Sequence, residues 1–259
     1  MIKVDNIYKR FGVKTVLNGV SLDVRSGETL VIIGSSGVGK SILLKNIIGL
    51  VKPDSGFIEV NGVNITNCSL EELHETRKKI GYVFQESALF DSLNIFENVA
   101  FGLKNLTSLS KSEIKQRTKQ CLSMVGLENV EHLNPSGLSG GMKKRVGLAR
   151  AIAYQPEYIL YDEPTTGLDP IMSDVINDLI INLKKYLHVT SIVVTHDMNS
   201  AYKIADRIMM LYGGNIIFNG TPDEVRSTKN KYVKQFVEGS SQGSIHTDRT
   251  FELERKKYE

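Results

Sequence analysis

The chain has 259 residues, enough to bury one large core or two subdomains. Hydrophobic residues make up 41% and charged residues 24%, and the net charge of +3 is too small to indicate a nucleic-acid partner. We find no apolar run as long as a membrane-spanning helix and no signal-peptide core at the N-terminus, so we expect a cytoplasmic protein.

The first part of the chain predicts an antiparallel sheet and then a buried strand. Alternating apolar and polar residues over 2–7 and 16–24 are typical of antiparallel strands with one buried face. The short apolar run 29–33 predicts a strand that is covered on both faces. The next expected elements are a helix over 41–50, a strand over 57–60, a helix over 70–77 and a strand over 79–84.

The middle of the chain, from about residue 87 to residue 154, has a helical pattern. Ser110 and Glu113 have the spacing of a capping box, and Gly126 is a candidate helix end. Between them, one helical face collects Ile114, Thr118, Cys121, Leu122 and Val125.

After Pro156 short apolar runs alternate with helical patterns, which predicts a parallel sheet with helices on its faces and hence an α/β fold. The final segment, 239–259, begins with a linker-like stretch and predicts a flexible or partner-dependent tail. The expected strands cover 158–161, 191–194 and 208–211, the helices 171–186, 198–205 and most of 221–236, and a hairpin 213–218.

A glycine-rich stretch directly follows the strand 29–33 and has the pattern GxxxxGK(S/T) of a phosphate-binding loop. Such a loop directs backbone N–H groups, and the N-terminus of the next helix, at phosphate oxygens. Lys40 would pair with the β- and γ-phosphates, and the Ser41 hydroxyl would bind Mg²⁺. The sequence therefore predicts a site for a nucleoside triphosphate. Its residues are Gly34, Ser35, Ser36, Gly37, Val38, Gly39, Lys40 and Ser41.

Two carboxylates follow a second apolar strand, at Asp162 and Glu163. A carboxylate at the first position supports Mg²⁺ beside the Ser41 position in phosphate-loop proteins. The next side chain would lie near the γ-phosphate, where it can orient and deprotonate the attacking water. We therefore predict that Glu163 is the general base of a hydrolysis reaction.

About twenty residues before Asp162, Leu138-Ser-Gly-Gly-Met142 opens a helix. With the two motifs above, this stretch resembles the nucleotide-binding subunits of ATP-binding cassette (ABC) transporters, whose signature is LSGGQ. The resemblance covers residues 1 to about 238. It implies a P-loop NTPase (RecA-like) core over 1–86 and 155–238, with an antiparallel β subdomain and a helical subdomain over about 87–154.

The resemblance also implies roles for residues outside the phosphate loop. Phe11 matches the aromatic residue that stacks on adenine, and His196 matches the switch histidine at the γ-phosphate. Gln85 matches the glutamine that links the nucleotide site to the helical subdomain, beside the Mg²⁺ held by Ser41 and Asp162. We therefore expect Lys40, Glu163 and His196 to act in the hydrolysis of ATP.

The signature implies a homodimer, because in this family each ATP lies between the phosphate loop of one subunit and the signature of its partner. Ser139, Gly140 and Gly141 would contact the partner's ATP, and Gly167-Leu-Asp169 would cross the interface. Met142 departs from the usual glutamine, and we expect the serine and glycines to suffice without it.

The stretch 84–101, together with Leu-Ser-Gly-Gly-Met, resembles the cassettes of bacterial lipid-asymmetry (Mla, Mce-associated) transporters. This implies transport of phospholipids or related lipids between membranes. The implied partners are an integral-membrane permease, an MCE-domain protein and a small STAS-domain protein. The cassette itself would then lie at the cytoplasmic face of the bacterial inner membrane.

Three other functions remain open. The same cassette could serve a transporter for another solute, such as an amino acid or a peptide, because the cargo contacts lie in other subunits. A soluble cassette of DNA repair or translation usually has a coiled-coil insertion or two fused cassettes, and this chain has neither. A scaffold that binds ATP without hydrolysing it would not need Glu163 and His196.

Overall fold

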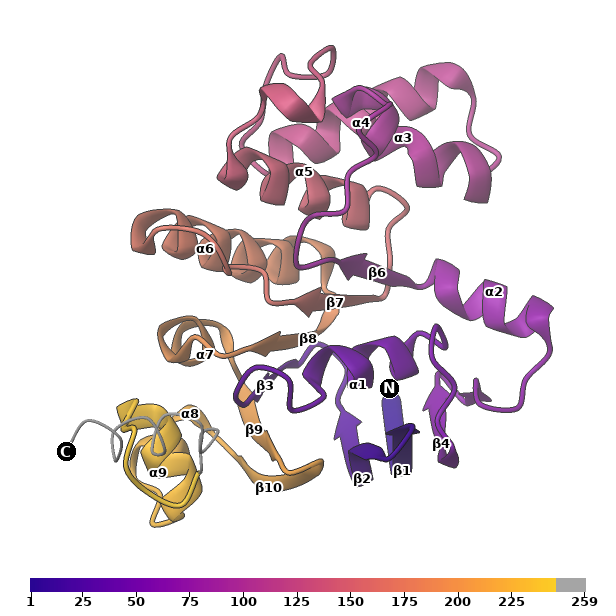
Figure 1. Cartoon of the computed structure of the whole chain (residues 1–259). Helices are drawn as coiled ribbons and strands as arrows, with labels where there is room; N and C mark the ends of the chain where they lie inside the picture. Colours follow the sequence, from indigo (N-terminus) through magenta and orange to yellow (C-terminus); the bar gives the residue numbers. More distant parts are fainter. Residues whose placement is uncertain (246–259) are drawn as a thin grey trace.

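The computed structural model describes residues 1–245 (Figure 1). Its strands are β1 (Ile2–Phe11), β2 (Lys14–Val24), β3 (Thr29–Ile33), β4 (Ser55–Val60), β5 (Val63–Asn64), β6 (Ile80–Val83), β7 (Tyr158–Asp162), β8 (Thr190–Thr195), β9 (Arg207–Tyr212) and β10 (Asn215–Gly220). Its helices are α1 (Lys40–Ile47), α2 (Leu70–Lys78), α3 (Ile95–Leu106), α4 (Lys111–Met124), α5 (Gly140–Ile152), α6 (Pro170–Leu187), α7 (Met198–Ile204), α8 (Pro222–Arg226) and α9 (Lys231–Glu238), with a 3-10 turn at Pro135–Gly137.

These strands form two sheets. One is antiparallel, in the order β2-β1-β4-β5, and the other has the order β10-β9-β3-β8-β7-β6. In the second sheet every neighbouring pair is parallel except the terminal hairpin of β9 and β10. The predicted antiparallel pair, parallel sheet and final hairpin are therefore confirmed, and the fold class is α/β as expected.

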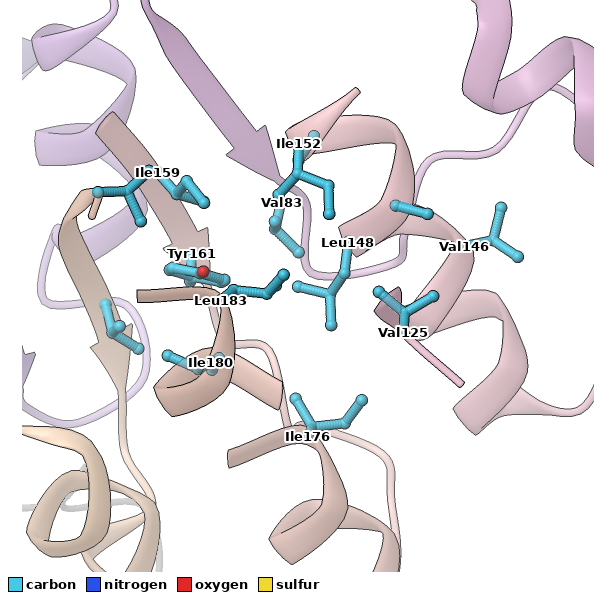
Figure 2. Close-up of a cluster of buried hydrophobic side chains, with 14 of the residues drawn as sticks. Val83, Val125, Val146, Leu148, Ile152, Ile159, Tyr161, Ile176, Ile180 and Leu183 are labelled. Carbon is cyan, nitrogen blue, oxygen red and sulfur yellow. The ribbon is translucent and has the colours of Figure 1, made fainter. Parts of the chain in front are cut away.

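The parallel sheet separates two hydrophobic clusters. In β3, Leu30 and Ile32 belong to the cluster shared with the antiparallel sheet and α1, whereas Val31 and Ile33 belong to the cluster beneath α5 and α6. Successive side chains of a strand point to opposite faces, so a run of five apolar residues is buried on both sides. Figure 2 shows the second cluster, where Ile159 and Tyr161 of β7 face Ile180 and Leu183 of α6.

Helices α3, α4 and α5 pack on one another at one end of the molecule, beyond β6 and α6 (Figure 1). The predicted capping box at Ser110 is present, and the predicted apolar face of α4 is buried. Gly126 follows the end of this helix with φ +69°, as expected for a C-terminal glycine.

The region after β10, which was predicted to be mostly helical over 221–236, contains the two helices α8 and α9. Thr221 caps α8 and Asn230 caps α9, and each cap accepts hydrogen bonds from the first turn of its own helix. An N-cap residue has extended backbone angles, so Asn230 ends any continuous helix across 221–236.

Residues 239–245, the first part of the predicted tail, lie against α9. The Gln235 amide donates to the carbonyls of Ser240 and Ile245 and accepts from the Ile245 N–H. The rest of the predicted tail, 246–259, lies outside the described residues. Within residues 1–245, no helix combines the length and apolar character needed to cross a membrane.

Candidate nucleotide-binding site

The loop between β3 and α1 is shaped by glycines that no other residue can replace without strain. Gly34 has φ +154°, and a Cβ atom there would lie 2.5 Å from the carbonyl oxygen of Leu211. Gly39 has φ +111° and would place a Cβ atom 2.9 Å from Val16. The loop therefore enters α1 with bare backbone, and the first turn of α1 carries no acidic residue to oppose an anion.

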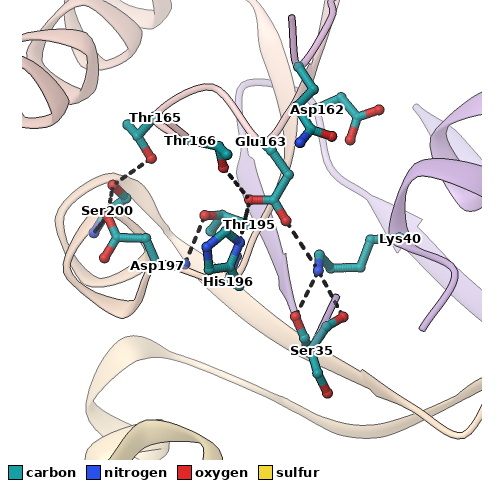
Figure 3. Close-up of polar contacts among 12 residues, drawn as sticks. Ser35, Lys40, Asp162, Glu163, Thr165, Thr166, Thr195, His196, Asp197 and Ser200 are labelled. Atoms are coloured by element: carbon teal, nitrogen blue, oxygen red, sulfur yellow. Dashed lines mark hydrogen bonds and ion pairs between the residues drawn. The ribbon is translucent and has the colours of Figure 1, made fainter. Parts of the chain in front are cut away.

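Lys40, the first residue of α1, is buried beneath this loop. Its Nζ donates to the carbonyl oxygens of Gly34 at 2.7 Å and Ser35 at 3.1 Å, and lies 3.2 Å from Oε1 of Glu163 (Figure 3). The ammonium is thus held at the centre of the loop by three oxygen atoms. A negatively charged phosphate oxygen can compete with these oxygens for the Lys40 ammonium, because hydrogen bonds between charged groups are the stronger kind.

Asp162 ends β7 and joins the phosphate loop to the neighbouring strand. Its Oδ1 accepts from the Ser41 hydroxyl at 2.7 Å, and its Oδ2 accepts from the Tyr82 hydroxyl at 3.0 Å. Burial, together with the Asp162 charge, raises the pKa of Tyr82 well above its usual value, so this hydroxyl stays protonated as a donor. The hydroxyl and carboxylate oxygens of Ser41 and Asp162 are of the hard type that Mg²⁺ binds.

Glu163 has an uncommon backbone conformation and close contacts with Lys40 and His196. Its φ is +49°, in the left-handed region, although it is not a glycine. Its Oε2 lies 2.8 Å from Nδ1 of His196 and accepts from the Thr166 hydroxyl at 3.1 Å, while Oε1 pairs with Lys40. The carboxylate therefore bridges the phosphate loop and the segment that follows β8 (Figure 3).

A cleft of about 520 Å³ lies over these groups. Phe11 stands at its edge with 49% of its surface exposed, and the Lys9 ammonium lies 5.4 Å from the centre of its ring. The cleft brings together predicted residues from five separate segments, and its lining is Phe11, Lys14, Val16, Ser36, Gly37, Gly39, Lys40, Ser41, Ile42, Gln85, Glu163, Thr166 and His196.

Residues 17–166 match the family described as ABC transporter. The chain belongs to the ABC transporter family. It is similar to the intermembrane phospholipid transport ATP-binding protein MlaF of Haemophilus influenzae, with 40% identity over 95% of this chain and 93% of that protein. It is also similar to the glycine betaine transport ATP-binding protein OpuAA of Bacillus subtilis, with 42% identity over 90% of this chain and 56% of that protein.

Among solved structures, the chain resembles a dimer of the ATP-binding cassette MJ0796 in a post-hydrolysis state with ADP and phosphate bound. The TM-score is 0.79 at 35% identity, over 86% of this chain and 99% of that one. Family, fold and site agree that the chain is the ATP-binding cassette of an ABC transporter, an ATPase coupled to transport.

The signature of the cassette lies apart from the cleft. Ser139 caps α5 by accepting from the Met142 N–H, and Gly141 packs so closely on Met172 that a Cβ atom would lie 2.6 Å from it. Neither these two residues nor Gly140 belongs to the lining given above for residues 1–245. The cassette thus carries a phosphate loop and a signature at separate places.

The remaining predicted residues of the loop lie beside the cleft rather than in its lining. Gly34 and Ser35 present carbonyl oxygens to Lys40, and Val38 packs against the cluster beneath the antiparallel sheet.

Several contacts of the cassette site were not predicted from the sequence. Tyr82 lies three residues before Gln85, and Thr166 follows Asp-Glu-Pro-Thr; the sequence motifs assign a role to neither residue. Both are polar residues next to a motif, and this position was the only available signal. Lys144 is one of three basic residues that directly follow the signature, and its sequence position alone predicts no contact with the site.

Proposed function

We propose that this cassette is the ATP-hydrolysing subunit of a bacterial complex that moves phospholipids or related lipids between membranes. The similarity to MlaF carries this proposal, because the chain spans 93% of a protein named for intermembrane phospholipid transport. OpuAA is slightly more identical, but the chain spans only 56% of it. The stretch 84–101, which resembles lipid-asymmetry cassettes, supports the same assignment.

In the proposed reaction, ATP occupies the cleft with adenine on Phe11 and its phosphates over the loop 34–41. Lys40 leaves Glu163 and pairs with the β- and γ-phosphates. Glu163 is then free to accept the proton of the attacking water, and His196 holds the γ-phosphate from the other side. The contacts of Glu163 with Lys40 and His196 support this, because they place all three groups around one point.

We assign the Mg²⁺ site to Ser41, Asp162 and Gln85. The ion would neutralise charge that develops on the phosphates. The pairing of the Ser41 hydroxyl with Asp162, and the position of Gln85 in the lining, support this set of oxygen ligands.

We infer that the working site forms between two copies of the chain. The separation of the signature from the cleft supports this, because Ser139, Gly140 and Gly141 can then act on the partner's ATP across a two-fold interface. In the same assembly the cassette divides into an ATP core over 1–86 and 155–238 and a helical subdomain over about 87–154, followed by the tail 239–259.

The proposed complex also contains a permease, an MCE-domain protein and a STAS-domain protein, and lies at the cytoplasmic face of the inner membrane. The second candidate is a transporter for another solute, which the 42% identity to a glycine betaine cassette favours. Since the cassette does not hold the cargo, only an experiment on the whole complex can distinguish these two functions.

The test is affinity purification of the tagged chain from detergent-solubilised native membranes, with mass spectrometry of the proteins and lipids recovered. We expect a permease, an MCE-domain protein and bound phospholipid. A permease of a solute importer, without phospholipid, would exclude the lipid assignment and keep the ATPase. Recovery with ribosomes or DNA alone would exclude both cargo assignments.

A further inference from the structure

Helix α5 carries two cationic side chains that donate to backbone carbonyl groups in or next to the nucleotide site. Lys144 donates from Nζ to the carbonyl oxygen of Gln85 and, at 3.4 Å, to that of Glu163. Two turns later, Arg150 donates to the carbonyl oxygens of Ser87 and Ala88. At 3.6 residues per turn, residues six apart are about 120° apart around a helix, so α5 reaches the two segments from two different sides.

The clamped segments have strained backbones. Ser87 and Ala88 have φ of +60° and +46°, and Glu163 has φ +49°. Non-glycine residues keep such angles only where surrounding contacts hold them. Arg150 supplies such contacts for Ser87 and Ala88, whereas Lys144 supplies one for Glu163 and another for Gln85, two residues before Ser87.

Lys144 as a whole residue is only 7% exposed, although lysine is among the residues least often buried. Burial lowers its pKa, and the neighbouring carboxylates of Glu86, Glu163 and Asp162 partly offset this effect. A buried ammonium needs acceptors, and here both acceptors are backbone carbonyls of residues that line the cleft.

We propose that Lys144 is a positioning residue, which ties the signature-bearing helix α5 to the backbones of Gln85 and Glu163 and so fixes the Glu163 carboxylate for hydrolysis. This inference rests on the proposed role of Glu163 as general base. Lys144 does not contact the nucleotide cleft, so it should affect turnover without affecting ATP affinity.

The test compares Lys144→Met with wild type in the cassette complex purified from native membranes. Methionine keeps the apolar stem and removes the donor. We expect kcat to fall by roughly 10-fold to 10²-fold, because a displacement of about 1 Å at a catalytic group can have that effect, with KM and ATP affinity unchanged. Lys143→Met is the matched control, since it removes the same charge one residue earlier on α5, and it should retain wild-type kcat.

A double-mutant cycle with Glu163→Gln identifies the route of the effect. Once the base is absent, its position no longer matters, so Lys144→Met should lower the residual rate by less than about twofold. The inference is wrong if Lys144→Met retains wild-type kcat, if it weakens ATP binding instead, or if the two losses multiply.

If Lys144→Met does not fold, the same measurements on Lys144→Leu decide, because leucine also removes the donor and keeps an apolar side chain. The roles of Glu163 and Lys144 can be tested separately. Wild-type turnover by Glu163→Gln would remove the proposed base, whereas an inactive Glu163→Gln beside a fully active Lys144→Met would remove only the role of Lys144.

Discussion

The Glu163 carboxylate contacts a different side chain with each of its two oxygens. Lys40 lies 3.2 Å from one oxygen and His196 lies 2.8 Å from the other. In this arrangement both carboxylate oxygens of the proposed base have a partner. A γ-phosphate that pairs with Lys40 would leave one of these oxygens without its partner. Binding and activation would therefore be one event at this residue.

The Glu163→Gln substitution tests this assignment. Glutamine keeps the size of the side chain but cannot accept the proton of the attacking water, so turnover should fall by at least ~10²-fold. ATP affinity should remain, because Lys40 and the loop are intact. Phosphate release and nucleotide titration measure the two effects, and near-normal phosphate release would contradict the role of Glu163.

At the scale of elements, an ion pair adds to the backbone pairing between β3, the strand before the phosphate loop, and its neighbour β9. Glu28 immediately precedes β3, and Arg207 is the first residue of β9, which pairs with β3. The guanidinium meets the buried carboxylate with two nitrogens, at 2.6 and 3.1 Å. A bidentate pair of this kind fixes direction as well as distance.

This pair predicts a specific pH dependence of stability. Burial alone would raise the pKa of Glu28, but the hydrogen bonds from Arg207 and the Arg25 amide outweigh it and hold the pKa below the ordinary 4.5. The stabilisation is therefore present above pH 4.5 and is lost as the pH falls through the lowered folded-state pKa. Glu28→Gln should destabilise the cassette by about 1–3 kcal/mol near neutral pH, and this difference should shrink at acid pH.

Urea unfolding of wild type and Glu28→Gln, at neutral pH and at steps below pH 4.5, measures that difference. Asp23→Asn is the control, because Asp23 is exposed and lies 3.7 Å from the same guanidinium. It should change stability much less. A difference that is constant across the pH range would contradict the assignment to the Glu28 carboxylate.

Elements whose pattern is local were predictable from the sequence. Strand β3 and the start of α1 follow from five apolar residues and a glycine motif, and their observed bounds agree with that pattern. Strand β5 has only two residues, too few for any periodicity, and the break between α8 and α9 depends on a single cap at Asn230.

The residues of the site also differ in how far the sequence predicts them. The motif residues of the cleft were predictable because each motif has fixed spacing. The contacts of Tyr82 and Lys144 depend on how β6 lies beside β7 and how α5 lies over both. Such contacts join residues about 20 to 80 positions apart, and their partners are mostly backbone atoms or side chains from other elements, so no short pattern encodes them.

At the scale of the whole molecule, the cleft and the signature lie at separate places in the fold. A cassette of this kind needs a second copy to complete the proposed site, and the similar cassette MJ0796 is described as dimeric with ADP and phosphate bound. ATP would then contact both copies at their interface and stabilise the dimer, and its hydrolysis would allow the copies to separate.

We therefore expect the purified chain to dimerise with ATP when hydrolysis is blocked, either by Glu163→Gln or by removal of Mg²⁺ with EDTA. Size-exclusion chromatography with light scattering measures the mass. Lys40→Ala should bind ATP weakly and remain monomeric under the same conditions. A dimer that forms equally without ATP, or with Lys40→Ala, would contradict the shared site.

The left-handed backbone of Glu163 has a consequence for laboratory evolution. A glutamate with φ +49° costs about 1–3 kcal/mol, and glycine or asparagine accepts this conformation more readily. Libraries screened for heat resistance alone would therefore tend to replace this carboxylate. The surviving variants would tolerate higher temperatures and no longer turn over ATP, so a thermostabilised form of this cassette has to be selected on its activity.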